Sequence, residues 1–442
     1  MIHSENTGWA YDVYPVYNYI MSTVKKIVSA LVFMTLFLLC GMGFRWLLID
    51  DTQSYTRLMM HEFYEQGKID NLFVGSSHCY AALDPAVTDK VFGANSFNAG
   101  SSLQALDASF ALIREAAERY DVKHIYLEMY YLMMSNDNYK ERDQLTGTYI
   151  ISDYMRPSFN KAKFLFEASA PKYYVNSFLP ARRNWEKLLH PSEGLALVRE
   201  KQKESYRNYK PIGGYRAKGF VSNQGEIPNG ILLDTAGFDS IHTESASADW
   251  LKTLREIINY CEKKGISLTL FSAPMTLFQT AGVGNYDDYI ELINHLIAGT
   301  KAEYVDFNLC REEYFDQTSD LFADAGHLNE RGAEVFSQLF ASHFSGAIAK
   351  DELFYESMAE KIAAHGPDIL GLSYLDSGDG MRKLKIVSTC PPGSLYSVEF
   401  CTADRDVQHL KDNSSDLYFE IPQETHGTIH VFSGEIEIEV EV

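Results

Sequence analysis

Between residues 71 and 345 the chain alternates short apolar runs with longer stretches of helical periodicity, and this alternation constrains its fold more than any other feature. The apolar runs are Asn71–Val74, Ser96–Asn98, His124–Leu127, Leu268–Phe271 and Tyr304–Phe307. Residues 105–119 and 248–264 carry apolar side chains at helical spacing. Strands that alternate with helices build a parallel sheet with helices against its faces. We therefore predict an α/β domain with a doubly wound parallel sheet.

A long apolar segment precedes this domain. Residues 27–44 contain no charged side chain, and Trp46–Ile49 extends the apolar stretch past Arg45 to a length that can cross a hydrocarbon core. The sequence therefore predicts one transmembrane helix over residues 27–49. A cleaved secretory signal fits less well, because the stretch is long and no small-x-small cleavage site follows it.

Charges on both sides of this segment indicate its orientation. Lys25 and Lys26 precede it, whereas Asp50 and Asp51 follow it. Positively charged residues favour the cytoplasmic side of a membrane helix. We therefore expect residues 1–26 to form a short cytoplasmic tail and the rest of the chain to lie outside the cytoplasm, held at the cell membrane by a single helix.

The predicted α/β domain covers residues 50–345 and is interrupted by an insertion over residues 138–247. The insertion is rich in Tyr, Arg and Lys. Insertions of this size often form a lid or a substrate wall, and they supply basic and aromatic groups that suit a glycan. A helical decoration without contact to any ligand is an equally good interpretation.

The pattern changes again in the last part of the chain, residues 346–442. Beyond about residue 366, apolar and polar residues alternate in Lys383–Val387, Leu417–Ile421 and Glu435–Val440, with turn residues between the runs. This alternation predicts a linker followed by a small antiparallel β-sandwich. We assign the sandwich an accessory role without chemistry.

Composition excludes several classes of function. The formal charge is -21, from 60 acidic and 39 basic residues, which argues against a nucleic-acid partner. The six cysteines show no ligand-like spacing, so neither a metal site nor a cofactor is indicated. Cys390 and Cys401 could pair across strands in an oxidising compartment, or remain two separate thiols.

Two distant motifs supply the chemistry. Gly75-Ser76-Ser77-His78 closes the first apolar run, and Asp324-Ala325-Gly326-His327 precedes the last helical stretch. A serine hydroxyl attacks only while a base removes its proton, histidine has the pKa for that task, and a carboxylate can orient the imidazole. We therefore predict Ser77 as nucleophile, His327 as base and Asp324 as the residue that orients it. His78 and Cys79 could tune the site or simply pack beneath it.

These motifs resemble those of the SGNH hydrolase superfamily, which has a flavodoxin-like doubly wound fold. Gly75–Ser77 is similar to its first block, with Ser77 as nucleophile, and Asp324 with His327 is similar to its last. Asn98-Ala99-Gly100 looks like the second block. The resemblance implies that the Gly100 amide, beside Asn98, helps the Ser77 amide to bind the oxyanion.

The third block of that superfamily, Gly-x-Asn-Asp, is missing. Glu128-Met129-Tyr130-Tyr131 stands after the third strand instead. Glu128 is therefore a further candidate for the oxyanion or substrate region, although a carboxylate replaces a donor there. Loss of one oxyanion donor typically costs about 10²- to 10³-fold in turnover.

The Ser-Ser-His form of the first block and the single membrane helix resemble a narrower group, the membrane-anchored acyltransfer proteins of teichoic acid D-alanylation and polysaccharide O-acetylation. The resemblance implies a serine O-acyltransferase or esterase that works through an acyl-enzyme on a cell-surface glycan or wall polymer. It also implies a membrane-bound O-acyltransferase as partner. The alternative is a tethered glycan-binding or assembly protein that kept the fold without turnover.

Overall fold

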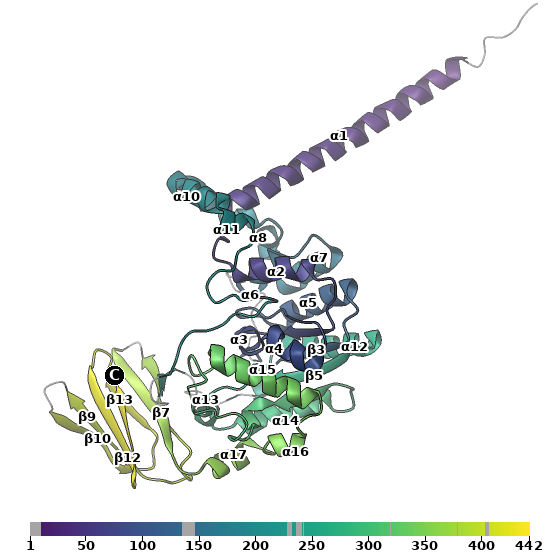
Figure 1. Ribbon diagram of the computed structural model, residues 1–442. Coiled ribbons are helices and arrows are strands. Elements are labelled where there is room, and N and C mark those ends of the chain that lie inside the picture. Colours follow the sequence, from purple (N-terminus) through teal and green to yellow (C-terminus); the bar gives the residue numbers. More distant parts are fainter. Residues whose placement is uncertain are drawn as a thin grey trace, which may run out of the picture. The chain divides into compact units, whose positions relative to one another are not determined.

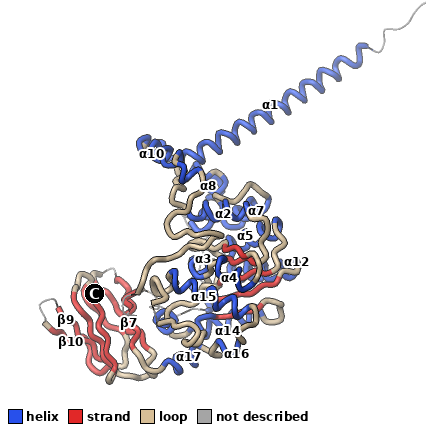
Figure 2. Tube along the Cα trace, in the orientation of Figure 1, coloured by secondary structure: helices blue, strands red, loops and turns tan. Residues whose placement is uncertain are grey.

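The computed structural model describes residues 10–134, 146–227, 232–235, 241, 243–318, 320–377, 379–402 and 406–442 (Figures 1 and 2). Parts of the predicted insertion, residues 138–145, 228–231, 236–240 and 242, lie outside the described residues. The chain divides into two compact units. One contains residues 1–52 and 172–208, and the other contains residues 53–171 and 209–442.

The first unit is built on a long helix, α1 (Ala10–Leu48). Among the described residues, the Tyr19–Leu48 part of this helix is long and apolar enough to cross a membrane. The helix begins well before position 27, where the sequence predicted its start, because Lys25, Lys26 and the residues before them continue the backbone hydrogen bonding of the apolar part.

Five short helical segments complete the first unit. They are α8 (Tyr174–Phe178), α9 (Pro180–Arg183), η4 (Trp185–Leu189), α10 (Pro191–Gln202) and α11 (Glu204–Arg207). A further short turn, η3 (Pro171–Tyr173), leads into them.

The second unit contains a parallel five-stranded sheet with the order β2-β1-β3-β5-β6. The strands are β1 (Asn71–Val74), β2 (Ser96–Asn98), β3 (His124–Glu128), β5 (Ser267–Ser272) and β6 (Glu303–Asp306). All four pairings are parallel, which confirms the predicted α/β sheet. The chain adds β2 on one side of β1 and β3 on the other. In parallel α/β sheets, ligands bind at the carboxyl ends of the strands beside such a reversal, which here are the ends of β1 and β3.

The second unit also contains the following helical segments, several of which pack on this sheet: α2 (Tyr55–Glu65), α3 (Ser77–Ala82), α4 (Pro85–Phe92), α5 (Leu106–Arg119), η1 (Tyr131–Met133), α6 (Thr146–Ser152), α7 (Phe159–Ala168), η6 (Thr243–Ser245), α12 (Ala248–Lys264), α13 (Leu277–Val283), α14 (Tyr286–Ile297), η7 (Phe307–Leu309), α15 (Glu330–Phe344), α16 (Lys350–Leu353) and α17 (Met358–His365). Phe340 of α15 packs edge-on against Phe73 and Phe271, so this helix covers the face of the sheet that carries them. The periodicity that predicted α5 and α12 is confirmed.

The C-terminal part contains two four-stranded sheets with the orders β10-β9-β12-β13 and β11-β8-β7-β4. The strands are β4 (Leu232–Asp234), β7 (Ile369–Ser377), β8 (Met381–Ser388), β9 (Tyr396–Thr402), β10 (Val407–Ser414), β11 (Tyr418–Pro422), β12 (Gly427–Ser433) and β13 (Ile436–Glu441). Buried residues of both sheets, among them Leu372, Leu384, Val398 and Ile429, share one core. The predicted antiparallel sheets are therefore confirmed, with one addition: β4 joins from the insertion and runs parallel to β7.

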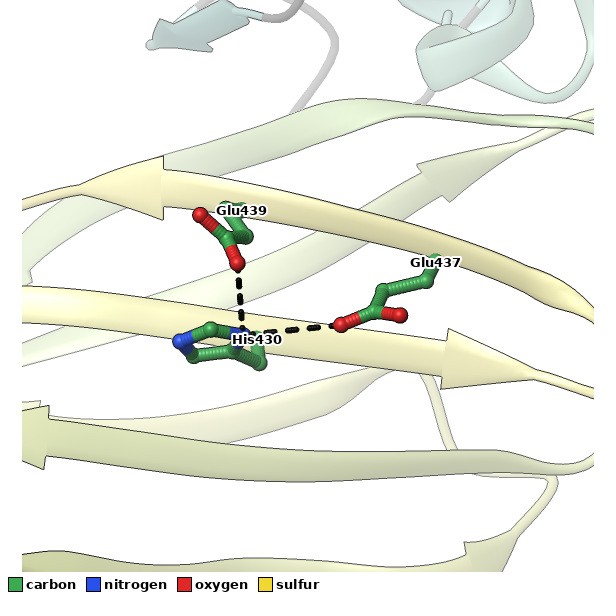
Figure 3. A group of neighbouring side chains, drawn as sticks. All are labelled: His430, Glu437 and Glu439. Carbon is green, nitrogen blue, oxygen red and sulfur yellow. Dashed lines mark ion pairs between the residues drawn. The ribbon is translucent and has the colours of Figure 1, made fainter.

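Figure 3 shows three side chains on the outer face of β12 and β13. The Nδ1 atom of His430 lies 3.3 Å from a carboxylate oxygen of Glu439 and 3.7 Å from one of Glu437. The three donor atoms lie within 4.8 Å of one another, but both carboxylates are exposed and face the imidazole. The group has the geometry of a cross-strand ion pair. On the same sandwich Cys390 and Cys401 are separate free thiols.

Candidate active site

The candidate nucleophile stands at the point where β1 turns into α3. β1 ends at Val74, and Ser77 is the first residue of α3. The Ser76 hydroxyl caps this helix by accepting a hydrogen bond from the His78 amide at 3.3 Å. Ser77 is partly exposed, and as the first helical residue it has a backbone amide without a partner inside the helix.

Three side chains of the two distant motifs form one hydrogen-bonded chain. The Nε2 atom of His327 lies 2.8 Å from the Ser77 hydroxyl oxygen. On the other side of the ring, Nδ1 lies 2.9 and 3.0 Å from the two carboxylate oxygens of Asp324. Desolvation works against the Asp324 charge, but hydrogen bonds from the His327 ring and from two backbone amides hold the pKa of this carboxyl below its ordinary value. The arrangement can deprotonate an alcohol and hold the resulting imidazolium.

The segment that follows β5 holds the loop that carries Asp324 and His327. Both the backbone amide and the hydroxyl of Thr276 donate to the carbonyl oxygen of Ala325, at 3.0 and 2.7 Å. Within the loop, the Ala323 amide donates to the His327 carbonyl oxygen at 2.8 Å. The base is therefore held by the segment after β5 as well as by its own loop.

His78 lies directly beneath the base. Its ring stacks on the His327 ring, with centroids 4.5 Å apart and an angle of 12° between the planes, and it also contacts the Tyr130 ring. The His78 ring is buried, and its Nδ1 atom has no hydrogen-bond partner among the residues that the structure describes. Burial, with a smaller effect of the His327 charge, lowers the pKa of His78 to about 3. His78 is therefore a neutral aromatic ring that supports His327. Of the two roles that the sequence left open for His78, this one includes packing.

The unpartnered nitrogen leads to a stability prediction. Replacing His78 with Phe keeps a ring under His327 and removes the buried, unpartnered Nδ1 atom, a defect that costs about 1–3 kcal/mol. It also removes the hydrogen bond between the ring and the Gly326 backbone, which offsets part of the gain. We expect His78→Phe to raise the free energy of unfolding by about 1 kcal/mol, measured by denaturant unfolding of the full chain in detergent. His78→Leu, which loses the ring stack, should gain less. Destabilisation by His78→Phe would contradict the assignment.

Asn98 and Gly100 lie beside the nucleophile turn, and they bind each other. The Gly100 amide donates to the Asn98 side-chain oxygen at 3.0 Å. The Asn98 side-chain nitrogen donates to the carbonyl oxygens of Cys79 and Leu83, both at 2.9 Å. Asn98 thus ties the loop after β2 to α3. For the Gly100 amide to bind an oxyanion, it must share or leave its bond to Asn98.

Glu128 holds the nucleophile turn from below. One oxygen of its buried carboxyl accepts hydrogen bonds from the Ser76 amide and the Ser76 hydroxyl, each at 2.7 Å. Burial raises the pKa of Glu128 to about 7, against the effect of these hydrogen bonds and of the His327 charge. A β-carbon added at Gly75 would lie 2.5 Å from the Glu128 β-carbon. Glycine is therefore required where the turn crosses this side chain.

One residue that no sequence motif indicated, Gln279, completes the surroundings. Gln279 is buried, and its side-chain nitrogen donates to the hydroxyls of Tyr130 and Tyr131 at 3.2 and 3.1 Å. A β-carbon added at Gly326 would lie 3.0 Å from the Gln279 side-chain oxygen. Gln279 therefore connects the Tyr130 ring under His78 to the base loop. In the sequence, only Glu128, which stands in place of the third block, indicated that this region belongs to the site.

No family model matches the chain, and no curated protein matches it in sequence. One similar solved structure is a Streptococcus pneumonia protein provisionally identified as a platelet activating factor, with 13% identity and a TM-score of 0.28 over 70% of this chain and 96% of that chain. Another is a modular endo-beta-1,4-mannanase from Cellulomonas fimi, with 12% identity and a TM-score of 0.18 over 89% of this chain and 98% of that chain. At these scores the similarity is weak, and the functional argument depends on the geometry of the site.

Proposed function

We propose that the chain is a membrane-anchored, extracytoplasmic serine O-acyltransferase or esterase of the SGNH type, which modifies a cell-surface glycan or wall polymer through an acyl-enzyme. The observation that carries the proposal is the hydrogen-bonded sequence from Ser77 through His327 to Asp324. The resemblance of both motifs to the SGNH blocks, and the parallel strand order, agree with it. Neither a metal nor an organic cofactor is needed for this chemistry.

In the proposed reaction the Ser77 oxygen attacks the acyl carbonyl carbon while the Nε2 atom of His327 takes the hydroxyl proton. The tetrahedral intermediate collapses as His327 passes that proton to the leaving group, and the acyl group remains on Ser77. An acceptor hydroxyl then gives its proton to His327 and attacks the ester carbonyl carbon, and His327 returns this proton to the Ser77 oxygen as the ester bond breaks. Asp324 keeps the imidazole in the required orientation. The oxyanion would be bound by the Ser77 amide and, once released from Asn98, by the Gly100 amide.

Transfer and hydrolysis differ in whether water reaches the acyl-enzyme. The Asp324 side chain is 52% exposed and that of His327 is 28% exposed, so the described residues leave the base open to solvent. We propose that a glycan acceptor, delivered at the membrane together with a membrane-bound O-acyltransferase, competes with water for this position. With purified full-length chain, acetate release in the presence of acceptor but without acceptor acylation would identify a plain esterase.

The proposal is tested by labelling the full-length chain with a fluorophosphonate and locating the adduct by peptide mass spectrometry. We expect the adduct on Ser77, because only an activated hydroxyl attacks the reagent. Ser77→Ala should abolish the labelling, whereas Ser342→Ala, which removes a partly exposed serine of α15, should not change it. Undiminished labelling of Ser77→Ala would exclude Ser77 as nucleophile.

A non-catalytic assembly or glycan-binding role is the second candidate. It is favoured by the Gly100 amide, which is bonded to Asn98, and by Glu128, which stands in place of an oxyanion donor. A scaffold should not depend on its hydroxyl or imidazole. Complementation of a deletion strain by both Ser77→Ala and His327→Ala would therefore support the scaffold and overturn the enzyme.

A further inference from the structure

Residues 172–208 pack around the last turn of α1, and we call this segment the collar. Three of its helical segments, α9, η4 and α10, contact α1. Figure 1 shows α8, α10 and α11 gathered at the end of the long helix. The collar belongs to the same compact unit as α1, so the two form one structural element.

The collar begins where the apolar part of α1 ends. The side chains from Ile27 to Phe44 are exposed along the helix, and burial starts only at Leu48 and Ile49, which are 3% and 8% exposed. Trp46, at the same level, is 43% exposed. If α1 spans a bilayer, this level is the membrane interface, where Trp side chains are enriched. The collar is then held at interfacial depth.

A buried lysine fixes the collar to the helix end. The ammonium of Lys201 lies 2.9 Å from an Asp51 carboxylate oxygen, and the Lys201 side chain is 1% exposed. It also donates to the carbonyl oxygens of Trp46, at 2.7 Å, and of Ile49. These are the carbonyl groups that a helix leaves unpaired at its end. Tyr206 donates to Asp51 as well, so the attachment is specific.

The collar exposes an unusual amount of apolar surface. Its apolar side chains with exposed fractions between 37% and 64% are Val175, Phe178, Leu179, Trp185, Leu188, Leu189 and Leu195. They lie on consecutive short segments beside the end of α1. Exposed apolar side chains concentrated in one part of a chain indicate a protein or membrane contact.

The collar is also basic in an otherwise acidic chain. Residues 172–208 contain eight Lys and Arg against four Glu, a net charge of +4, whereas the whole chain carries -21. The basic residues are Lys172, Arg182, Arg183, Lys187, Arg199, Lys201, Lys203 and Arg207. Lys201 is buried against Asp51, so the other seven are the ones that can meet lipid headgroups. A segment that is rich in basic residues and also in exposed Leu and Trp has the composition of an interfacial segment. Its charge is complementary to anionic phospholipid headgroups.

We propose that the collar lies in the headgroup layer of the bilayer that α1 enters, with its exposed apolar side chains in the upper acyl region and its basic side chains on lipid phosphates. This inference rests on the proposed membrane anchoring of α1. It requires nothing of the Ser77 chemistry. The surface recognised is the phospholipid bilayer itself, so the anchor consists of one inserted helix and one monotopic segment.

The test uses the full-length chain in lipid nanodiscs whose phosphatidylcholine and phosphatidylglycerol carry brominated acyl chains, which quench nearby Trp fluorescence. The variant with Trp9, Trp46 and Trp250 replaced by Phe retains Trp185 as its single Trp. We expect its emission to fall severalfold relative to discs without bromine. The fall should be smaller in discs of phosphatidylcholine alone, because the basic side chains then lose their anionic partners.

Two matched variants in a Trp-free background calibrate the measurement. Phe37→Trp, on α1, should be quenched, and Leu395→Trp, an exposed position of the C-terminal sandwich, gives the reference for a Trp outside α1 and the collar. Unquenched Trp185 together with quenched Phe37→Trp would overturn the proposal and leave the collar facing solvent or a protein partner. Unquenched Phe37→Trp would overturn it together with the anchor. Fluorophosphonate labelling of the same discs reports on Ser77 separately, so failure of the catalytic proposal is recognised independently.

Discussion

Replacing His327 with Gln is expected to lower acyl turnover by about 10⁴- to 10⁶-fold, the range found when the base of a serine triad is removed. The Gln side chain cannot take the proton from the Ser77 hydroxyl, which the Nε2 atom of His327 approaches to 2.8 Å. The fold should survive, because the His327 side chain is partly exposed. The effect is measured as the rate at which the full-length chain in detergent cleaves a chromogenic acetyl ester.

Asp324→Asn provides the matched comparison. It keeps the size of the side chain but removes the charge that holds the imidazole, so the loss should be smaller, about 10³- to 10⁴-fold. The two substitutions should be far from additive when combined, because both residues act through one imidazole. Turnover of His327→Gln at the wild-type level would contradict a triad at this site.

Gly75→Ala is expected to have the second largest effect. The added methyl group would lie 2.5 Å from the Glu128 β-carbon and 3.1 Å from the Cys79 β-carbon. The turn must shift, and displacement of a nucleophile by about 1 Å costs about 10²-fold in rate. We therefore expect fluorophosphonate labelling to slow at least about 100-fold, together with a loss of about 1–3 kcal/mol from overpacking.

Gly93→Ala is the control for this substitution. Gly93 also has a positive φ, of 61°, but among the described residues no heavy atom beyond its chain neighbours lies within 4 Å of the added β-carbon. It should lower the unfolding free energy by about 1–2 kcal/mol, the cost of a left-handed conformation in a residue with a β-carbon, and leave the labelling rate unchanged. Equal labelling rates for Gly75→Ala and the wild type would show that contact with Glu128 does not set the position of Ser77.

The central sheet could be read from the sequence because its strands are buried on both faces. Asn71–Val74 and Ser96–Asn98 are the exact bounds of β1 and β2, and the other three predicted strands are shifted or extended by one residue at either end. The three-residue strand β4 was missed for a physical reason. Its Leu232–Asp234 sequence has no alternation of its own, and its pairing partner β7 is distant in the chain. Contacts with distant parts of the chain determine whether such a short segment forms a strand.

The candidate site could be predicted only as far as its motifs extend. The sequence named Ser77, Asp324 and His327, and the structure brings them within hydrogen-bonding distance of one another. It did not predict that His78 lies under the base or that Glu128 holds the turn. Both depend on burial and ring orientation, which no local pattern encodes. The hydrogen bond from the Gly100 amide to Asn98 could not be predicted either, because it depends on the rotamer of the Asn98 side chain.

His78 follows the nucleophile directly in α3, and its ring supports the imidazole that the nucleophile needs. The loop carrying that imidazole is in turn fastened to Thr276 after β5. The end of the insertion reaches both sides of the site as well. The Lys218 carbonyl accepts a hydrogen bond from the Asn98 amide, and the Asn223 side chain donates to the carbonyl oxygen of Leu328, the residue after the base. Substitutions at this end of the insertion are therefore expected to alter the chemistry of the site, even where they touch neither the nucleophile nor the base.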